Sequence, residues 1–158
     1  MTIDKDTLNL IKRLQTSPPV NIVGIAKMIG LAVWEDADLA TGVSGKIFRD
    51  SKNGGSLGYS IVIRAQDSIA RKRFTVAHEL AHYVLHRNLF KDLLIEDALY
   101  RSGLSSSIEA QANGLAADLL MPWSLLAPVS DQPVDRLAKM FQVSEEAMRI
   151  RLQKPKSF

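Results

Sequence analysis

Apolar and polar residues alternate with helical period at the amino-terminal end of the chain. Over residues 4–16 the apolar side chains recur at the spacing of one helix face. The prolines that follow cannot continue a helix, and residues 21–29 predict a second, shorter one. Gly30 stands directly after it, where helices often end in a left-handed residue.

The pattern then changes to that of strands. Three segments are rich in residues typical of strands: "LAVWE", "TGVSGKIFRD" and "LGYSIVIR". Between the last two lies "SKNGGS", whose residues accept positive φ, so we expect these two segments to form a hairpin with a long loop. Apolar and polar residues largely alternate over residues 59–64, which predicts a strand with one buried face.

Helical period returns over residues 69–87 and again over 107–120, while residues 88–106 are predicted to be irregular or mixed. Two short helices are expected in the tail, at about 133–140 and 144–153. The order of helices, strands and helices predicts an α+β fold with a small antiparallel sheet of about three strands.

Composition places this chain among soluble globular proteins. Its 158 residues predict a single domain over 1–158, and 46% apolar with 23% charged residues is ordinary for that class. No apolar run is long enough to span a bilayer, and the first residues do not resemble a signal peptide. The absence of cysteine excludes disulfides and thiolate metal sites, and we expect a cytoplasmic protein. A net charge of +3 permits nucleic acid as a partner but does not indicate it.

The stretch "RFTVAHELAHYVLH" contains every histidine of the chain. His78 and His82 are four residues apart, so on a helix both imidazoles face the same way and can bind one metal ion. Glu79 lies about 100° around the helix, where it can act as the general base of a metallopeptidase. The alternative is a solvated helix that carries histidines by chance.

A third ligand would decide between these interpretations. His86 stands about 12 Å along the helix axis from His78, too far to share an ion, so we expect it to support the site or the helix end. Glu109 precedes Asn113 by four residues on the next amphipathic helix, and it can complete a His-His-Glu site with Asn113 beside a ligand. Alternatively, Glu109 is an ordinary first-turn glutamate. Asp118 is a weaker ligand candidate.

These residues resemble the ImmA/IrrE family of metallopeptidases. The resemblance rests on "RFTVAHELAHYVLH" followed by "EAQANGLAADLLMP", a pair of motifs more specific than H-E-x-x-H alone. It implies a zinc ion held by His78, His82 and Glu109, with Glu79 as base, on two helices packed against the sheet. Leu115 stands where the family commonly has phenylalanine, which changes packing and not the chemistry.

The resemblance also implies a regulatory role. Characterised members cleave a helix-turn-helix repressor, and others belong to mobile elements or toxin–antitoxin-like pairs, so such a repressor is the expected partner.

The sequence leaves other features of the site open. The donor that stabilises the oxyanion could be Tyr59, Tyr83, Tyr100 or Arg101. The oligomeric state is not predicted, and manganese or iron would also suit two histidines and a carboxylate.

The segment "RLAKMFQVSEEAMRIRL" suggests a competing function, because it resembles a helix-turn-helix unit. A recognition helix presents its first residues to the major groove, and here those are Glu145 and Glu146, which disfavour DNA binding. A pair of scaffold helices is the simpler interpretation. A third hypothesis is a zinc-containing module that binds a repressor without cutting it.

Overall fold

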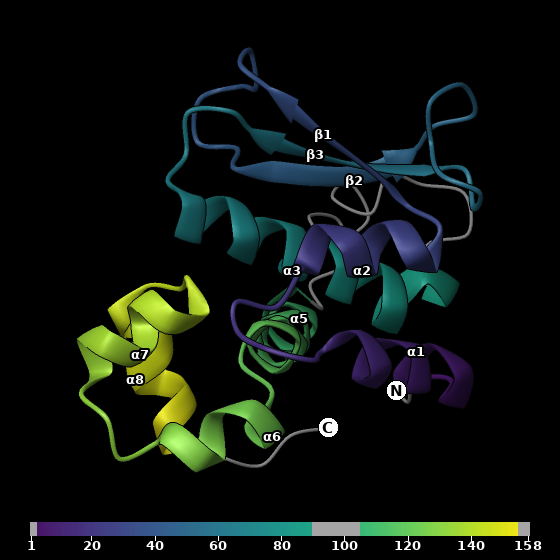
Figure 1. The fold of residues 1–158 in the computed structure, drawn as a ribbon. Coiled ribbons are helices and arrows are strands. Elements are labelled where there is room, and N and C mark those ends of the chain that lie inside the picture. The colour runs from purple at the N-terminus through teal and green to yellow at the C-terminus, as the bar shows by residue number, and fades with distance from the viewer. Residues whose placement is uncertain (1–2, 90–104, 155–158) are drawn as a thin grey trace.

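The computed structural model describes residues 3–89 and 105–154. The part of the predicted irregular segment at 90–104 lies outside the described residues. The α+β class is confirmed, and the predicted helices and strands occur in the predicted order (Figure 1). The elements are α1 (Lys5–Leu14), α2 (Ile22–Ile29), β1 (Ala32–Asp36), β2 (Gly45–Arg49), β3 (Tyr59–Arg64), α3 (Ile69–His86), η1 (Arg87–Leu89), α5 (Ser105–Leu120), α6 (Trp123–Leu126), η2 (Ala127–Val129), α7 (Val134–Phe141) and α8 (Glu145–Gln153).

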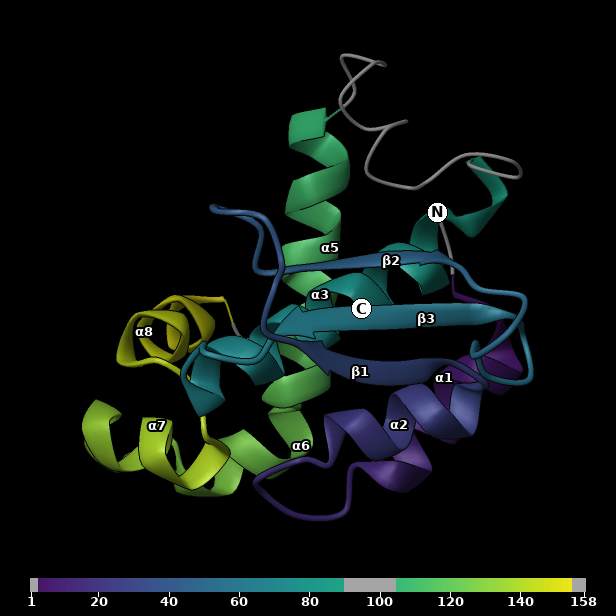
Figure 2. The same cartoon turned by 90° about the horizontal axis from the view of Figure 1, so that it is seen from above.

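The sheet has three strands in the order β1-β3-β2 (Figure 2). The expected hairpin is confirmed, because β2 and β3 pair antiparallel, with Ile47 opposite Ile61. The expectation of an entirely antiparallel sheet is wrong: β1 pairs with β3 in parallel, so the sheet is mixed. The prediction of one buried face for β3 is also wrong, because residues 60–63 are all buried in this central strand. Residue alternation carries no information on strand order. Here β3 inserts between its two predecessors.

One face of the sheet is covered by helices and forms the core. Ile47 and Ile61 are fully buried on this face, and α3 runs beneath them, with α5 beneath α3 in turn (Figures 1 and 2). Helix α2 packs against both α3 and β1. Gly30 ends α2 with φ 110°, as the sequence predicts. Helix α3 is therefore the central element, buried between the sheet and α5.

The two carboxy-terminal helices dock onto the end of α5. Phe141 and Met148 are fully buried in the core. Arg151 of α8 is 4% exposed, and its guanidinium lies 2.7 Å from the Asp118 carboxylate of α5. Its Nε donates to the Met121 carbonyl at 2.9 Å. A buried ion pair with a second hydrogen bond thus fixes α8 relative to α5.

No helix among the described residues is both long enough and apolar enough to cross a membrane.

Replacing Arg151 by methionine should destabilise the protein strongly. The substitution keeps an apolar stem but leaves the Asp118 carboxylate, whose side chain is 13% exposed, without its cation. We expect a loss of about 3 kcal/mol or more in the free energy of unfolding, measured by urea denaturation. Arg149→Met is the matched control, because its ion pair with Glu145 is exposed and is expected to contribute less than about 0.5 kcal/mol. Equal losses in the two variants would contradict this account of how α8 is held.

Candidate metal centre

Small side chains allow α3 and α5 to approach closely. Ala77 and Ala81 on α3, and Ala112 and Ala116 on α5, are all completely buried. Since alanine adds only a methyl group, the two helix axes can lie close together along this contact. Longer polar side chains beside the alanines then meet across the interface. The centre is built from these side chains.

Three donor atoms converge between the helices. The Nε2 atoms of His78 and His82 are 3.0 Å apart. The Glu109 carboxylate places one oxygen 3.2 Å from His78 Nε2 and the other 3.1 Å from His82 Nε2. In a tetrahedral zinc site, ligand atoms about 2.0–2.1 Å from the ion lie roughly 3.3 Å from one another. The two nitrogens and the carboxylate thus form a triangle of donor groups, in which one ligand atom from each residue lies within 4.8 Å of the others, close enough to share such an ion.

Asn113 orients the first histidine. Its side-chain oxygen lies 3.0 Å from Nδ1 of His78. An amide oxygen only accepts hydrogen bonds, so Nδ1 of His78 must carry the proton. The lone pair of the same ring is then on Nε2, which points at the triangle of donors. This is the supporting position that the sequence predicts for Asn113.

A chain of hydrogen bonds orients the second histidine. Nδ1 of His82 lies 3.2 Å from Nδ1 of His86, and Nε2 of His86 lies 3.3 Å from the side-chain oxygen of Gln111. Because the Gln111 oxygen accepts, Nε2 of His86 donates, and Nδ1 of His86 is left to accept from His82. The lone pair of His82 is thereby placed on Nε2, toward the triangle. His86 lies behind His82 and outside the triangle, as its distance from His78 along the helix predicts.

Burial keeps these imidazoles neutral. It is the largest cause of the fall in the pKa of His82 to about 3, and the neighbouring His78 and His86 add to it. Burial is also the main reason why the pKa values of His78 and His86 are lowered. Only a neutral imidazole has a lone pair to offer a metal ion. At neutral pH the two histidines are therefore in the form that binds metal.

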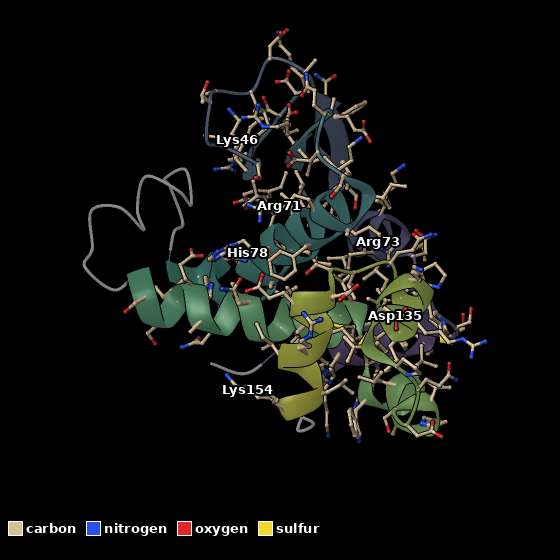
Figure 3. The ribbon with its side chains drawn as sticks, turned by 90° about the vertical axis from the view of Figure 1, so that its left-hand side faces the viewer. Lys46, Arg71, Arg73, His78, Asp135 and Lys154 are labelled. Carbon is tan, nitrogen blue, oxygen red and sulfur yellow. The ribbon has the colours of Figure 1, made fainter. Side chains whose placement is uncertain are left out.

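The centre borders an open cleft of about 930 Å³, which His82 does not line. Glu79 is 7% exposed and lines this cleft together with His78 and Glu109. One wall is the loop before β2 together with the first residue of β2, at residues 42–45, and the opposite wall is α8, through residues such as Ile150. Figure 3 shows His78 where α3 approaches α5, near α8. A carboxylate beside two imidazoles in an open cleft can exchange protons with a bound molecule.

Other candidates from the sequence lie away from this centre. Asp118 pairs with Arg151 and does not belong to the group of donors. Tyr59 and Tyr83 pack edge to face, with ring centroids 5.2 Å apart, and neither lines the cleft. Neither of these tyrosines is therefore placed to stabilise an oxyanion. The remaining two oxyanion candidates, Tyr100 and Arg101, lie outside the described residues.

Sequence reasoning missed three polar residues of this region. Gln111 ends the hydrogen-bond chain behind His82, and nothing in its spacing distinguishes it from a solvated helix position. Arg71 and Ser44 line the cleft and contact one another. Arg71 precedes His78 by seven residues, two helical turns, so the spacing could have placed it on the same face. The contact between Arg71 and Ser44 joins residues that are 27 positions apart in the chain, so no local pattern in the sequence predicts it.

Comparison with known proteins identifies a matching family and a solved structure with a similar fold. The family model of the IrrE N-terminal-like domain matches residues 36–153. A solved structure of a Mycobacterium tuberculosis transcriptional regulator has a similar fold, with a TM-score of 0.60 and 16% sequence identity over 98% of this chain. The match covers 49% of the regulator, so the present chain spans about half its length. No curated protein matches the chain.

Replacing Asn113 by alanine should weaken metal binding without unfolding the protein. Asn113 is exposed, so its loss affects the orientation of the His78 ring and little else. We expect the affinity for zinc to fall about tenfold to a hundredfold, measured by competition with a chelator. Asn88→Ala, at an exposed asparagine just beyond α3, should leave the affinity unchanged. An unaltered affinity in the Asn113 variant would show that its hydrogen bond does not orient a ligand.

The metal-free protein should lose stability as the pH falls below about 6.5. In the unfolded chain His82 has its ordinary pKa of 6.5, whereas folding lowers it to about 3. Between these values the unfolded chain binds a proton that the folded chain does not, so acid favours unfolding. The free energy of unfolding should therefore decrease by up to about 1.4 kcal/mol per pH unit from this group. Urea denaturation in the presence of a chelator measures this slope, and His82→Gln should make it shallower. Identical slopes would refute the assignment to His82.

Proposed function

This chain belongs to the ImmA/IrrE family of peptidases, and we propose that it is a zinc-dependent endopeptidase. One observation carries the proposal: the Nε2 atoms of His78 and His82 lie 3.0 Å apart, and each has a Glu109 oxygen within 3.2 Å, beside the buried Glu79. The hydrogen bonds of Asn113 and His86 support it, because they leave both Nε2 atoms free to bind an ion. Neutral imidazoles and a carboxylate are ligands that zinc prefers.

The proposed reaction is hydrolysis of a peptide bond in the cleft. A zinc ion held by His78, His82 and Glu109 would supply a Lewis acid that polarises a carbonyl and lowers the pKa of water. A carboxylate oxygen of Glu79 takes a proton as the water oxygen attacks the carbonyl carbon. The same oxygen returns that proton to the amide nitrogen as the carbon–nitrogen bond breaks. Glu79 therefore acts first as base and then as acid.

A helix-turn-helix repressor is the proposed substrate, and derepression of its target genes the outcome. Support for this partner comes from the family resemblance. A cleft of about 930 Å³ has the size to accept an extended segment of another protein. Stress response, mobile elements and toxin–antitoxin-like pairs are the settings in which such a cleavage would act.

The contacts of α8 favour a scaffold role over DNA binding. Arg151 is buried against α5, and Glu146 and Ile150 face the cleft. Glu145 forms an exposed ion pair within α8, with Arg149. A recognition helix must instead present a free face with donors for bases and phosphates. Binding of a repressor without cleavage stays the alternative function, and it differs from the proposal in not requiring Glu79.

Replacing Glu79 by glutamine should abolish cleavage and preserve the bound metal. The amide is nearly the same size but cannot take a proton, so we expect the rate to fall at least about a hundredfold. The assay is mass spectrometry of a proteome-derived peptide mixture incubated with the zinc-loaded protein. Native mass spectrometry should find one zinc ion in the wild type and in Glu79→Gln, but a weakened or lost ion in Glu109→Ala.

Two outcomes would contradict the proposal. Cleavage that continues in Glu79→Gln would remove Glu79 from the mechanism. A wild type that binds zinc but cleaves neither the peptides nor an added helix-turn-helix repressor would favour the binding module instead.

A further inference from the structure

A single basic side chain faces the proposed substrate cleft. Among the described residues that line it, Arg71 is the one lysine or arginine, whereas Glu79, Glu109 and Glu146 contribute carboxylates. Arg71 is exposed, and Figure 3 shows it on the same helix as His78. Apart from the proposed metal ion, an extended substrate would therefore meet a positively charged side chain at only one place in the described part of the cleft.

The Arg71 guanidinium is held in place by a serine. Its Nε and one terminal nitrogen donate to the Ser44 hydroxyl oxygen at 3.2 and 3.0 Å. Ser44 is fixed in turn, since its carbonyl accepts from the Arg64 backbone at 2.8 Å. The Arg64 guanidinium also donates to the neighbouring Val43 carbonyl at 2.8 and 3.1 Å. Binding an anion to a group that is already positioned costs less conformational entropy.

No carboxylate within the described residues neutralises Arg71. None lies within 4.0 Å of its guanidinium, whereas the adjacent Lys72 pairs with Glu35 at 2.9 Å. Arginine has five N–H donors in a planar fork, and Ser44 uses only two of them here. The remaining donors can bind a carboxylate through two parallel hydrogen bonds. The Ser44 hydroxyl accepts from Arg71 and keeps its own proton to donate.

The spacing along α3 sets the position of this group relative to the metal centre. Arg71 and His78 are seven residues apart on one helix, about 10.5 Å along its axis. An extended peptide advances about 3.3 Å per residue, so this distance corresponds to about three residues of substrate.

We propose that Arg71 and Ser44 form a carboxylate-binding subsite, which selects substrates with an aspartate or glutamate about three residues from the bond that is cut. This rests on the proposed function, and it names the class of polypeptide that the cleft accepts. Arg71 is a specificity-determining residue in this scheme and takes no part in bond cleavage. Glu146, on the opposite wall of the cleft, would disfavour a second acidic residue near itself.

Peptide binding tests the subsite without requiring cleavage. Three fluorescein-labelled ten-residue peptides share a neutral alanine and leucine sequence and differ at one position, which is Asp, Asn or Lys. Fluorescence anisotropy with zinc-loaded Glu79→Gln should show the Asp peptide binding roughly tenfold more tightly than the Asn peptide. Adding Arg71→Glu should reverse the preference toward the Lys peptide. Arg136→Glu is the matched control, because it makes the same charge change at an exposed residue outside the cleft.

Equal affinities for the Asp and Asn peptides would overturn the subsite, as would a preference that survives Arg71→Glu. Failure of all three peptides to bind at millimolar concentration would also overturn it. The cleavage assay separates this proposal from the proposed function. Cleavage that depends on Glu79 but shows no enrichment of acidic residues about three positions from the cut refutes the subsite alone. An Asp preference in binding, together with no cleavage by the wild type, refutes the peptidase and leaves the subsite in place.

Discussion

The close packing of α3 against α5 is the constraint on which the rest of the site depends. Fully buried residues such as Ala81 and Ala112 bring the helices close enough for Glu109 to reach both His78 and His82. A larger residue at such a position would separate the helices by about the size of its added atoms. Overpacking of this kind also destabilises the core. The Glu109 oxygens lie 3.1 and 3.2 Å from the two Nε2 atoms, so a displacement of that size would move the carboxylate away from the histidines. The packing of the helices and the geometry of the ligands therefore require the same small residues in the sequence.

Much of the fold and part of the site could be predicted because they depend on local spacing. The four-residue interval between His78 and His82 fixes their shared face on any helix. The helices and strands follow from the periodicity of the apolar residues in the same way, and Gly30 ends α2 as expected. The parallel pairing of β1 with β3 had no such signal, because strand order is decided by how the chain returns across the sheet. The predicted pairing of Glu109 with the histidines needed two motifs on separate helices, which periodicity alone does not connect.

Polar contacts between distant segments were the least predictable part. Gln111 contributes through His86, two hydrogen bonds away from the proposed ion, and a glutamine on an amphipathic helix is usually solvated. Arg71 reaches Ser44 across 27 residues of chain, through a loop held by Arg64. These contacts follow from the tertiary arrangement of the loop and the helix. No pattern within one element contains them, although the helical spacing of Arg71 and His78 indicates their common face.

The carboxy-terminal helices α7 and α8 are the part of the chain on which the peptidase and DNA-binding interpretations differ. The sequence resembles a helix-turn-helix unit because the turn between α7 and α8 and the buried Phe141 and Met148 are what any tightly packed helix pair requires. A DNA-binding helix-turn-helix unit differs in that its second helix has a free face for the major groove. In α8 one side is bound to α5 through Arg151, and another side forms a wall of the cleft through Glu146 and Ile150. The residues that bind α8 to α5 and line the cleft are not available to a major groove, so this packing favours the scaffold interpretation of α8.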